Sequence, residues 1–277
     1  MDAHKGTFGR VLIVAGSRGM SGAAVLCGSA ALRGGAGLVQ VAVPESIQAI
    51  VATGEPAYLT TAIPENRAGH WHPRAAGFLE AEFPKCDALA IGPGCGRSSY
   101  FRMFVEKTYR TLPQPMIVDA DALNALASRG TDLSVHAGPR IITPHPGEFS
   151  RLTDLTTAQI AENRELHAKE FARRNNIVVL LKGHGTVITD GQRTVINTTG
   201  NSGMATGGTG DVLTGLIAAL VAQRLSPLDA AICGADLHGL AGDLAAAQFS
   251  APGMTAGDLL EMLTQAWLMR CDAGDVD

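Results

Sequence analysis

Short apolar runs alternate with longer helical segments along almost the whole chain, and this alternation constrains the fold more than any other feature. The early runs are continuously apolar, as in strands that are buried on both faces of a parallel sheet. The last two are short, are separated by Asp190-Gly191, and indicate a hairpin at one edge. The predicted strands are residues 10–15, 38–43, 88–91, 116–118, 140–142, 178–181, 187–189 and 194–196. The sequence therefore predicts an α/β fold with a mostly parallel central sheet and an edge hairpin.

The helical segments have readable starts and no linker divides them. The start signals are capping boxes at Thr156/Gln159 and Thr255/Asp258, and an N-cap followed by proline at Ser226-Pro227. From Gly210 onward the chain is predicted to be almost wholly helical. Because no proline- or serine-rich linker, charge block or internal repeat is present, we expect residues 1–277 to form one domain.

Glycine, proline and aspartate follow many of the predicted strands. Five such loops begin at residues 16, 92, 119, 143 and 182. In an open parallel sheet, ligands bind outside the carboxyl ends of the strands. The concentration of polar residues and glycines in these loops predicts an active site at that edge.

The strongest local signal is Gly207-Gly208-Thr209-Gly210-Asp211, which comes directly before an apolar helix. Glycine backbone N–H groups and the positive end of a helix can together bind a phosphate. An aspartate at that point can act as the base that takes a proton from a hydroxyl attacking a phosphoryl group. The alternative is an ordinary acid in the first turn that stabilises the helix dipole.

Two earlier glycine loops, at residues 16–22 and 92–96, are weaker signals. The first follows a strand but does not match G-x-G-x-x-G, and it lacks the Lys-Ser/Thr of a P-loop. Tight turns account for either loop taken alone.

His145 and Glu148 share one loop at the predicted edge. Asp119 and Asp121 lie in a second loop at that edge, and Lys182 lies in a third. His145 is either a capping residue or a side chain held against a ligand, and Glu148 could organise Mg²⁺ through water. Asp119 and Asp121 either cap the following helix or face the site. Lys182 either contacts phosphate or simply ends a strand.

Charge and cysteine content exclude several partners. The net charge is −4 with no long basic run, which argues against nucleic acid and anionic membranes. The five cysteines are scattered and never form a C-x-x-C pair, which argues against a zinc site or a disulfide framework. With no apolar signal core and no membrane-length stretch, we expect a cytoplasmic protein.

Taken together, the loops resemble those of ADP-dependent NAD(P)H-hydrate dehydratases, which belong to the ribokinase-like superfamily. The resemblance extends from Lys5 nearly to Trp267, and it depends on the order and number of modest motifs. Those motifs are Ala15-Gly16-Ser17, Gly19-Met20-Ser21-Gly22-Ala23-Ala24, Arg33-Gly34-Gly35-Ala36-Gly37-Leu38, Ile91-Gly92-Pro93-Gly94, Asp119-Ala120-Asp121-Ala122-Leu123-Asn124, Thr143-Pro144-His145-Pro146-Gly147-Glu148, Leu181-Lys182-Gly183 and Gly203-Met204-Ala205-Thr206-Gly207-Gly208-Thr209-Gly210-Asp211-Val212-Leu213. The resemblance implies a ribokinase-like three-layer α/β/α fold.

The resemblance also implies a reaction and its residues. The hydrate of NADH or NADPH is dehydrated at the expense of ADP, with Mg²⁺, giving AMP, phosphate and the repaired cofactor. Asp211 is then the catalytic residue. The implied hydrate contacts are Ala36, Gly94, Gly96, His145 and Asp211, the implied adenine-nucleotide contacts are Lys182, Gly183, His184, Gly185, Thr186 and Gly210, and Glu148 is the implied metal-organising acid.

Further expectations follow from the same resemblance. It implies a homotetramer, and it implies cooperation with a separate NAD(P)H-hydrate epimerase, since the epimerase domain of many relatives has no counterpart here. Ser202 stands where proline is usual and Thr209 where serine is common, and neither change removes a backbone donor.

Two alternatives remain at this point. A small-alcohol kinase of the hydroxyethylthiazole-kinase type would share the glycine-rich loop and Asp211, but it would stop at a phosphorylated product. A non-catalytic adenylate-binding module would need neither Asp211 nor Glu148. The residues alone do not separate ADP from ATP, or the hydrate of NADH from that of NADPH.

Overall fold

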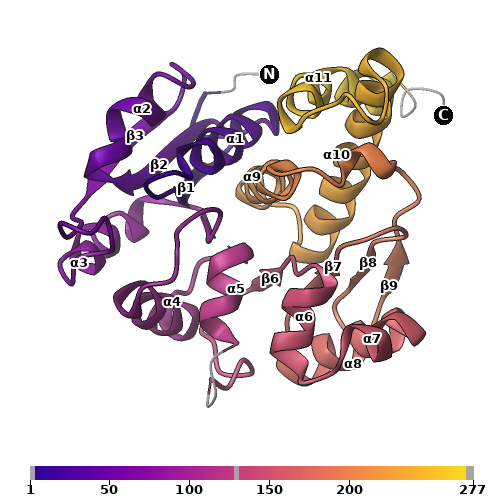
Figure 1. Ribbon diagram of the computed structural model, residues 1–277, viewed down its shortest axis with the longest axis horizontal. Coiled ribbons are helices and arrows are strands. Elements are labelled where there is room, and N and C mark those ends of the chain that lie inside the picture. Colours follow the sequence, from indigo (N-terminus) through magenta and orange to yellow (C-terminus); the bar gives the residue numbers. More distant parts are fainter. Residues whose placement is uncertain (1–3, 128–130, 273–277) are drawn as a thin grey trace.

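The computed structural model describes residues 4–127 and 131–272, and its strands form one nine-stranded sheet (Figure 1). The strand order is β3-β2-β1-β4-β5-β6-β7-β8-β9. Strands β1 to β7 are parallel, and β8 and β9 are antiparallel additions at one edge. The strands are β1 Arg10–Val14, β2 Leu38–Pro44, β3 Leu59–Ile63, β4 Ala88–Ile91, β5 Met116–Val118, β6 Arg140–Ile142, β7 Val178–Leu181, β8 Val187–Thr189 and β9 Thr194–Ile196. The predicted mostly parallel sheet with an edge hairpin is confirmed.

Strand β3 was not predicted from the sequence. It lies at the edge of the sheet beside β2, and its first residue, Leu59, is exposed. Its central Thr-Thr-Ala is only partly buried, so β3 lacks the continuous apolar run by which the buried strands were recognised. The first two predicted strands each differ by one residue, since β1 ends at Val14 and β2 extends to Pro44.

Helices cover both faces of the sheet and complete a three-layer arrangement (Figure 1). The helices are α1 Ser21–Arg33, α2 Gln48–Ala52, α3 Ala75–Glu80, α4 Ser99–Thr111, α5 Ala120–Leu126, α6 Pro146–Thr153, α7 Thr157–Glu162, α8 Arg164–Asn175, α9 Thr209–Ala222, α10 Pro227–Phe249 and α11 Ala256–Asp272. Helices α1, α2, α9, α10 and α11 pack on one face, and α3 to α8 pack on the other. The capping boxes at Thr156 and Thr255 and the N-cap at Ser226 are confirmed.

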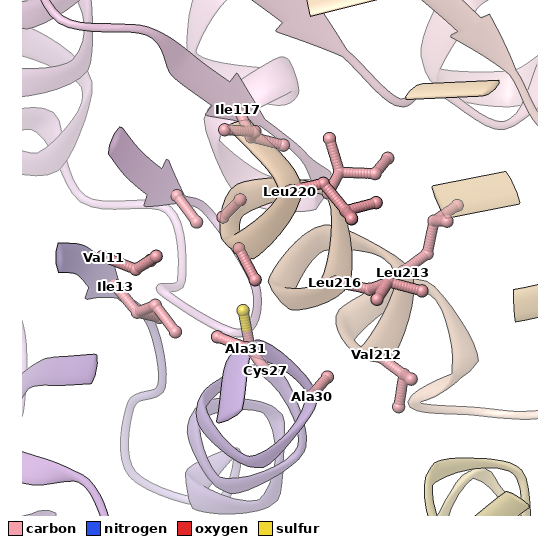
Figure 2. Close-up of a cluster of buried hydrophobic side chains, with 14 of the residues drawn as sticks. Val11, Ile13, Cys27, Ala30, Ala31, Ile117, Val212, Leu213, Leu216 and Leu220 are labelled. Carbon is pink, nitrogen blue, oxygen red and sulfur yellow. The ribbon is translucent and has the colours of Figure 1, made fainter. Parts of the chain in front are cut away.

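Each central strand contributes side chains to two hydrophobic cores, because successive side chains point to opposite faces of the sheet. In β1, Val11 and Ile13 belong to one core, while Leu12 and Val14 belong to the other. Helix α9 is buried along nearly its whole length against α1 and the sheet. Figure 2 shows this packing, with Val212, Leu213, Leu216 and Leu220 of α9 near Cys27, Ala30 and Ala31 of α1 and near Val11, Ile13 and Ile117 of the strands. This packing fixes the start of α9 relative to the strand ends.

Among the described residues, no helix is long and apolar enough to cross a membrane. All five cysteines are free thiols, and three of them are buried.

Candidate active site

The loops at the carboxyl ends of the parallel strands are tied to one another by backbone hydrogen bonds. The Gly16 N–H donates to the carbonyl of Pro93 (2.7 Å), which joins the loops after β1 and β4. The Lys182 N–H donates to the carbonyl of Pro144 (2.8 Å), which joins the loops after β7 and β6. The predicted grouping of these loops at one edge is therefore present in the structure.

Helix α9 begins at this edge with a glycine that no other residue could replace cheaply. Gly208 is the N-cap and has a left-handed φ of 96°. A Cβ at this position would lie 2.5 Å from Cδ1 of Leu26. The Thr209 hydroxyl donates to the carbonyls of Met204 and Thr206, which closes the preceding loop onto the helix. The backbone N–H groups of the first turn are thus held at the site.

A buried histidine supports the same helix start from behind. Burial lowers the pKa of His238 to about 4, so its ring is neutral at physiological pH. The protonated Nε2 of that ring donates to the carbonyl of Thr209 (2.8 Å).

Asp119 does not cap the helix that follows it. Its side chain makes no capping hydrogen bond, and the residue is only 1 % exposed. Instead, Lys182 Nζ donates to Asp119 Oδ1 (2.9 Å) and Thr214 Oγ1 donates to Asp119 Oδ2 (2.8 Å). Because a buried carboxylate requires such partners, this network accounts for the burial of Asp119 beside the helix start.

Lys182 lies against Gly210, as expected if both hold the same nucleotide. A Cβ built on Gly210 would lie 3.3 Å from Lys182 Nζ and 3.7 Å from Asp119 Oδ2. Burial lowers the pKa of Lys182, but the charges of Asp119, Glu148 and Asp211 outweigh that effect and raise the pKa above its ordinary value. A permanently charged ammonium group therefore lies beside the start of α9.

Asp211 occupies the first turn of α9, and its carboxylate has no hydrogen-bond partner within residues 4–127 and 131–272. Burial, followed by the negative charge of Asp119, raises the pKa of Asp211 to about 7, although Lys182 opposes this shift. A general base is most effective when its pKa lies near the working pH. The structure thus gives Asp211 the protonation behaviour that the predicted role requires.

His145 and Glu148 form a local capping pair at the start of α6. His145 Nδ1 accepts from the N–H groups of Gly147 (3.0 Å) and Glu148 (3.4 Å). The Glu148 carboxylate accepts from the His145 N–H (2.9 Å), and its other oxygen lies 3.3 Å from His145 Nε2. The imidazole is half exposed at the active edge, so the capping role that the sequence left open is present and a hydrate contact stays a prediction.

The predicted nucleotide loop, residues 182–186, is clamped by an arginine that the sequence did not single out. Arg164, the first residue of α8, donates through its guanidinium to the carbonyls of Leu181 (2.9 Å), Lys182 (3.1 Å) and His184 (2.5 Å). Thr186 Oγ1 closes the loop by donating to the carbonyl of Gly183 (2.9 Å). Lys182, Gly183, His184, Gly185 and Thr186 therefore form one ordered loop next to Gly210.

Gly94 and Gly96 lie on the opposite side of the site from this loop, because β4 and β7 are separated by β5 and β6. Gly94 has φ 61° and packs against α1, where an added Cβ would approach Ala23 to 2.9 Å. The Gly96 N–H donates to Asp121 Oδ2 (2.9 Å), so Asp121 also turns toward the site.

Ala36 is the one predicted hydrate contact that the structure does not bring to this edge. It precedes β2, so it lies at the amino end of the parallel strands. Its neighbour Gly35 packs against Gln223, the C-cap of α9, which comes twelve residues after Asp211. At 1.5 Å per residue, these ends of α9 are about 18 Å apart. Within one chain, Ala36 and Asp211 thus lie near opposite ends of α9, and a contact of Ala36 with the hydrate stays a prediction.

The described residues contain no group of three or more His, Cys, Asp or Glu side chains placed to hold a metal ion. Glu148 and Asp119 are close enough to influence Lys182, but their oxygens already accept hydrogen bonds from the protein. Such a donor set suits Mg²⁺ that keeps most of its water and is held mainly by nucleotide phosphates.

Three supporting residues could not be found from the sequence as site residues. Thr214 is an unremarkable position within an apolar helix, and Arg164 and His238 each belong to distant helices. Asp119, the partner of Thr214, could be recognised from the sequence as a candidate, because it directly follows a strand at the predicted edge.

The sequence and the fold are both similar to those of known proteins. A family model described as NAD(P)H-hydrate dehydratase matches residues 11–265. The bifunctional NAD(P)H-hydrate repair enzyme Nnr of Moorella thermoacetica is 48% identical over 264 residues, which cover 95% of this chain and 50% of that protein. The chain thus spans about half the length of the curated relatives it matches.

Two solved structures show the same fold. The ADP/ATP-dependent NAD(P)H-hydrate dehydratase of Bacillus subtilis, co-crystallized with ATP/Mg²⁺, matches with a TM-score of 0.82 and 31% identity over 97% of this chain and 92% of that one. A ribokinase-like superfamily protein of Enterococcus faecalis matches with a TM-score of 0.80 and 27% identity over 97% and 89% of the two chains. The sheet and its helical layers are therefore ribokinase-like.

Proposed function

The chain belongs to the NAD(P)H-hydrate dehydratase family, and on that basis we propose that it dehydrates the hydrates of NADH and NADPH with ADP as co-substrate. The products are the repaired cofactor, AMP and phosphate. The observation that carries the proposal is Asp211, an unpartnered carboxylate with a pKa of about 7 at a helix start beside Lys182.

Asp211 takes the proton of the hydrate's hydroxyl group as that oxygen attacks the β-phosphorus of ADP. The bond from this phosphorus to the bridging oxygen breaks, and AMP leaves. Lys182 and the first-turn N–H groups of α9 stabilise the charge on the transferred phosphoryl group. Mg²⁺, bound to the nucleotide phosphates, would supply further neutralisation, with Glu148 placed to contact it through water.

The second step is elimination. Phosphate leaves with the electron pair of the carbon–oxygen bond, because the lone pair of the ring nitrogen forms a carbon–nitrogen double bond. Loss of a proton from the neighbouring ring carbon then restores the dihydronicotinamide. Every atom of the lost water is accounted for: its oxygen leaves in the phosphate and its hydrogens leave as protons.

An isotope experiment tests this sequence. NADH hydrate formed in ¹⁸O-water carries the label on its hydroxyl group, and turnover with ADP and Mg²⁺ is followed by recovery of NADH absorbance. We expect the label in inorganic phosphate. Label in water, with ADP left intact, would contradict the phosphorylation step. A run with ATP in place of ADP tests nucleotide choice, since the Bacillus subtilis protein is described as ADP/ATP-dependent.

Several coarser features belong to the same proposal. We propose one domain over residues 1–277, a homotetramer, a cytoplasmic location and cooperation with an NAD(P)H-hydrate epimerase activity, which the bifunctional names of the relatives support. Light scattering of the purified protein tests the tetramer. Turnover of a mixture of the two hydrate epimers, with and without added epimerase, tests the cooperation.

No specific observation favours a kinase that stops at the phosphorylated product, or a non-catalytic module. The family match favours dehydration over the first. The raised pKa of Asp211 argues against the second, because binding alone does not require a base tuned to neutral pH.

A further inference from the structure

A hollow of about 570 Å³ opens beside the active edge, between the starts of α4 and α5 and the exposed side of α6. Its lining includes Gly96, Arg97 and Arg102 from the α4 side, Asp121 and Asn124 from α5, and Arg151 from α6. This volume lies within the range of pockets that hold small-molecule ligands.

The hollow shares a wall with the reaction centre. Gly96 lies at its rim, and the Gly96 N–H donates to Asp121 Oδ2 (2.9 Å). Asp121 is also close enough to Asp211 for its charge to contribute to the raised pKa of that carboxyl. A ligand that reaches Asp211 could therefore continue into the hollow without crossing the sheet.

The electrostatics of the hollow favour an anion. Three arginines line it against one acid, Asp121, and Arg102 also faces Glu106 of its own helix, with Nε and Oε1 4.0 Å apart. Arg97 lies 3.6 Å from Asp121, and Arg151 Nη1 donates to the amide oxygen of Asn124 (2.9 Å), a neutral partner. The first turn of α4, which opens onto the hollow, contains no acidic residue, so the positive end of that helix dipole is not neutralised by its own side chains.

The arrangement of the strands decides which anion fits. The proposed ADP loop follows β7, whereas most residues of the hollow follow β4 and β5, so β6 lies between the strands that lead to the two. A dinucleotide hydrate with its damaged ring at Asp211 must place its other half away from the ADP already bound. That half carries a pyrophosphate and, in NADPH hydrate, an additional 2′-phosphate.

We propose that this hollow binds the phosphate-bearing ADP-ribose half of the hydrate, with Arg102 and Arg151 contacting its phosphates. The inference rests on the proposed function, because it takes the dinucleotide as the substrate. Guanidinium groups suit this role, since they bind phosphate through paired donors.

Titration calorimetry with ADP-ribose and 2′-phospho-ADP-ribose tests the assignment, on full-length protein saturated with ADP and Mg²⁺ so that the nucleotide loop is filled. Because a hydrogen bond to a charged group is worth about 1.5–3 kcal/mol, we expect Arg102→Gln and Arg151→Gln each to weaken binding about tenfold or more. Arg110→Gln, an exposed position at the far end of α4, removes the same charge outside the hollow and should bind like wild type.

Turnover separates this inference from the proposed function. If wild type dehydrates the hydrate, the two hollow variants should raise KM for the hydrate about tenfold while KM for ADP stays unchanged. Normal hydrate KM in both variants, or equal weakening in Arg110→Gln, would overturn the subsite and leave the dehydratase proposal standing. No turnover by wild type, with ADP-ribose binding that still depends on Arg102 and Arg151, would overturn the function and leave the anion site.

Discussion

Lys182 Nζ lies 2.9 Å from Asp119 Oδ1, and Thr214 holds the other oxygen of the same buried carboxylate. This pairing has two consequences at once. It keeps Lys182 charged beside Gly210, where the phosphate is proposed to bind, and the charge of Asp119 helps to raise the pKa of Asp211. The pKa values of the cation, Lys182, and of the proposed base, Asp211, are thus both raised by one buried residue.

Replacing Asp119 should shift the pH dependence of kcat/KM. In wild type, kcat/KM should rise through about pH 7 as Asp211 ionises. In Asp119→Asn, the charge that raises this pKa is gone and Lys182 still lowers it, so the midpoint should move to lower pH. The measurement is kcat/KM against pH between 5 and 9. Thr214→Val, which removes a hydrogen bond but no charge, should keep the wild-type midpoint, and an unshifted midpoint in Asp119→Asn would contradict the coupling.

Arg164→Lys should weaken nucleotide use specifically. Lysine cannot reach three carbonyls with a planar fork, so the loop that carries Lys182 and His184 loses at least one clamp. We expect KM for ADP to rise about tenfold, in keeping with the loss of one charge-assisted hydrogen bond, while KM for the hydrate is retained. Arg173→Lys, an exposed change in the last turn of the same helix, is the matched control. Equal effects on both KM values would indicate general unfolding of the site instead.

Gly210→Val tests whether the phosphate lies against the start of α9. Gly210 is not in a left-handed conformation, so its backbone accepts a side chain, but a Cβ would already approach Lys182 Nζ to 3.3 Å. Valine would fill the space proposed for the phosphate. Calorimetry should show ADP affinity lowered tenfold or more with a melting temperature within a few degrees of wild type. Unchanged affinity in a folded variant would place the nucleotide elsewhere.

Site residues that directly follow a buried strand could be predicted from the sequence. Site residues whose partners are distant in the sequence could not. Buried strands such as β5 and β7 are continuous apolar runs, so their ends, and with them Asp119 and Lys182, could be located. Strand β3 was missed because half of it faces solvent. Arg164 and Thr214 were missed because no local pattern indicates a side chain whose partners are distant in the sequence.

Ala36 lies apart from the other predicted site residues within the chain. Its glycine-rich turn looks like the functional loops, but direction along the sheet decides which edge a loop joins. Ala36 precedes β2, whereas the other predicted residues follow β4, β6 and β7 or begin α9. A tight turn between α1 and β2 also accounts for its burial and for the hydrogen bond that its N–H donates to the carbonyl of Ala31.

Arg140 at the opposite edge should matter for stability alone. Its guanidinium is 1 % exposed and donates only to backbone carbonyls, those of Tyr109, Leu112, Gln114 and Pro139. Arg140→Met keeps much of the volume but leaves several buried carbonyls unsatisfied, which should lower the free energy of unfolding by at least ~3 kcal/mol. Arg110→Met, exposed on α4, should change it by less than about 0.5 kcal/mol. Turnover per folded molecule should stay normal in both, as chemical denaturation with parallel assays can check.

Asp211→Asn separates a catalytic base from a residue that only stabilises its helix. The amide cannot accept the hydroxyl proton, so kcat should fall ~10²–10⁴-fold, while ADP affinity is kept by backbone N–H groups and Lys182. Stability should change in the direction that the pKa dictates. The folded pKa of about 7 exceeds the unfolded value of about 3.9, so stability from protonated Asp211 is complete below the unfolded pKa and is lost as pH rises through 7.

At pH 8 the wild-type protein therefore holds an unfavourable buried charge that Asp211→Asn removes. We expect the variant to be more stable than wild type at pH 8 by an amount on the order of 1–4 kcal/mol, and close to wild type at pH 4. A helix-stabilising role predicts the reverse, a loss of ~0.3–1 kcal/mol at pH 8 with turnover nearly intact. Measuring kcat and the unfolding free energy at both pH values on one preparation decides between them, and near-normal turnover would remove Asp211 from the mechanism.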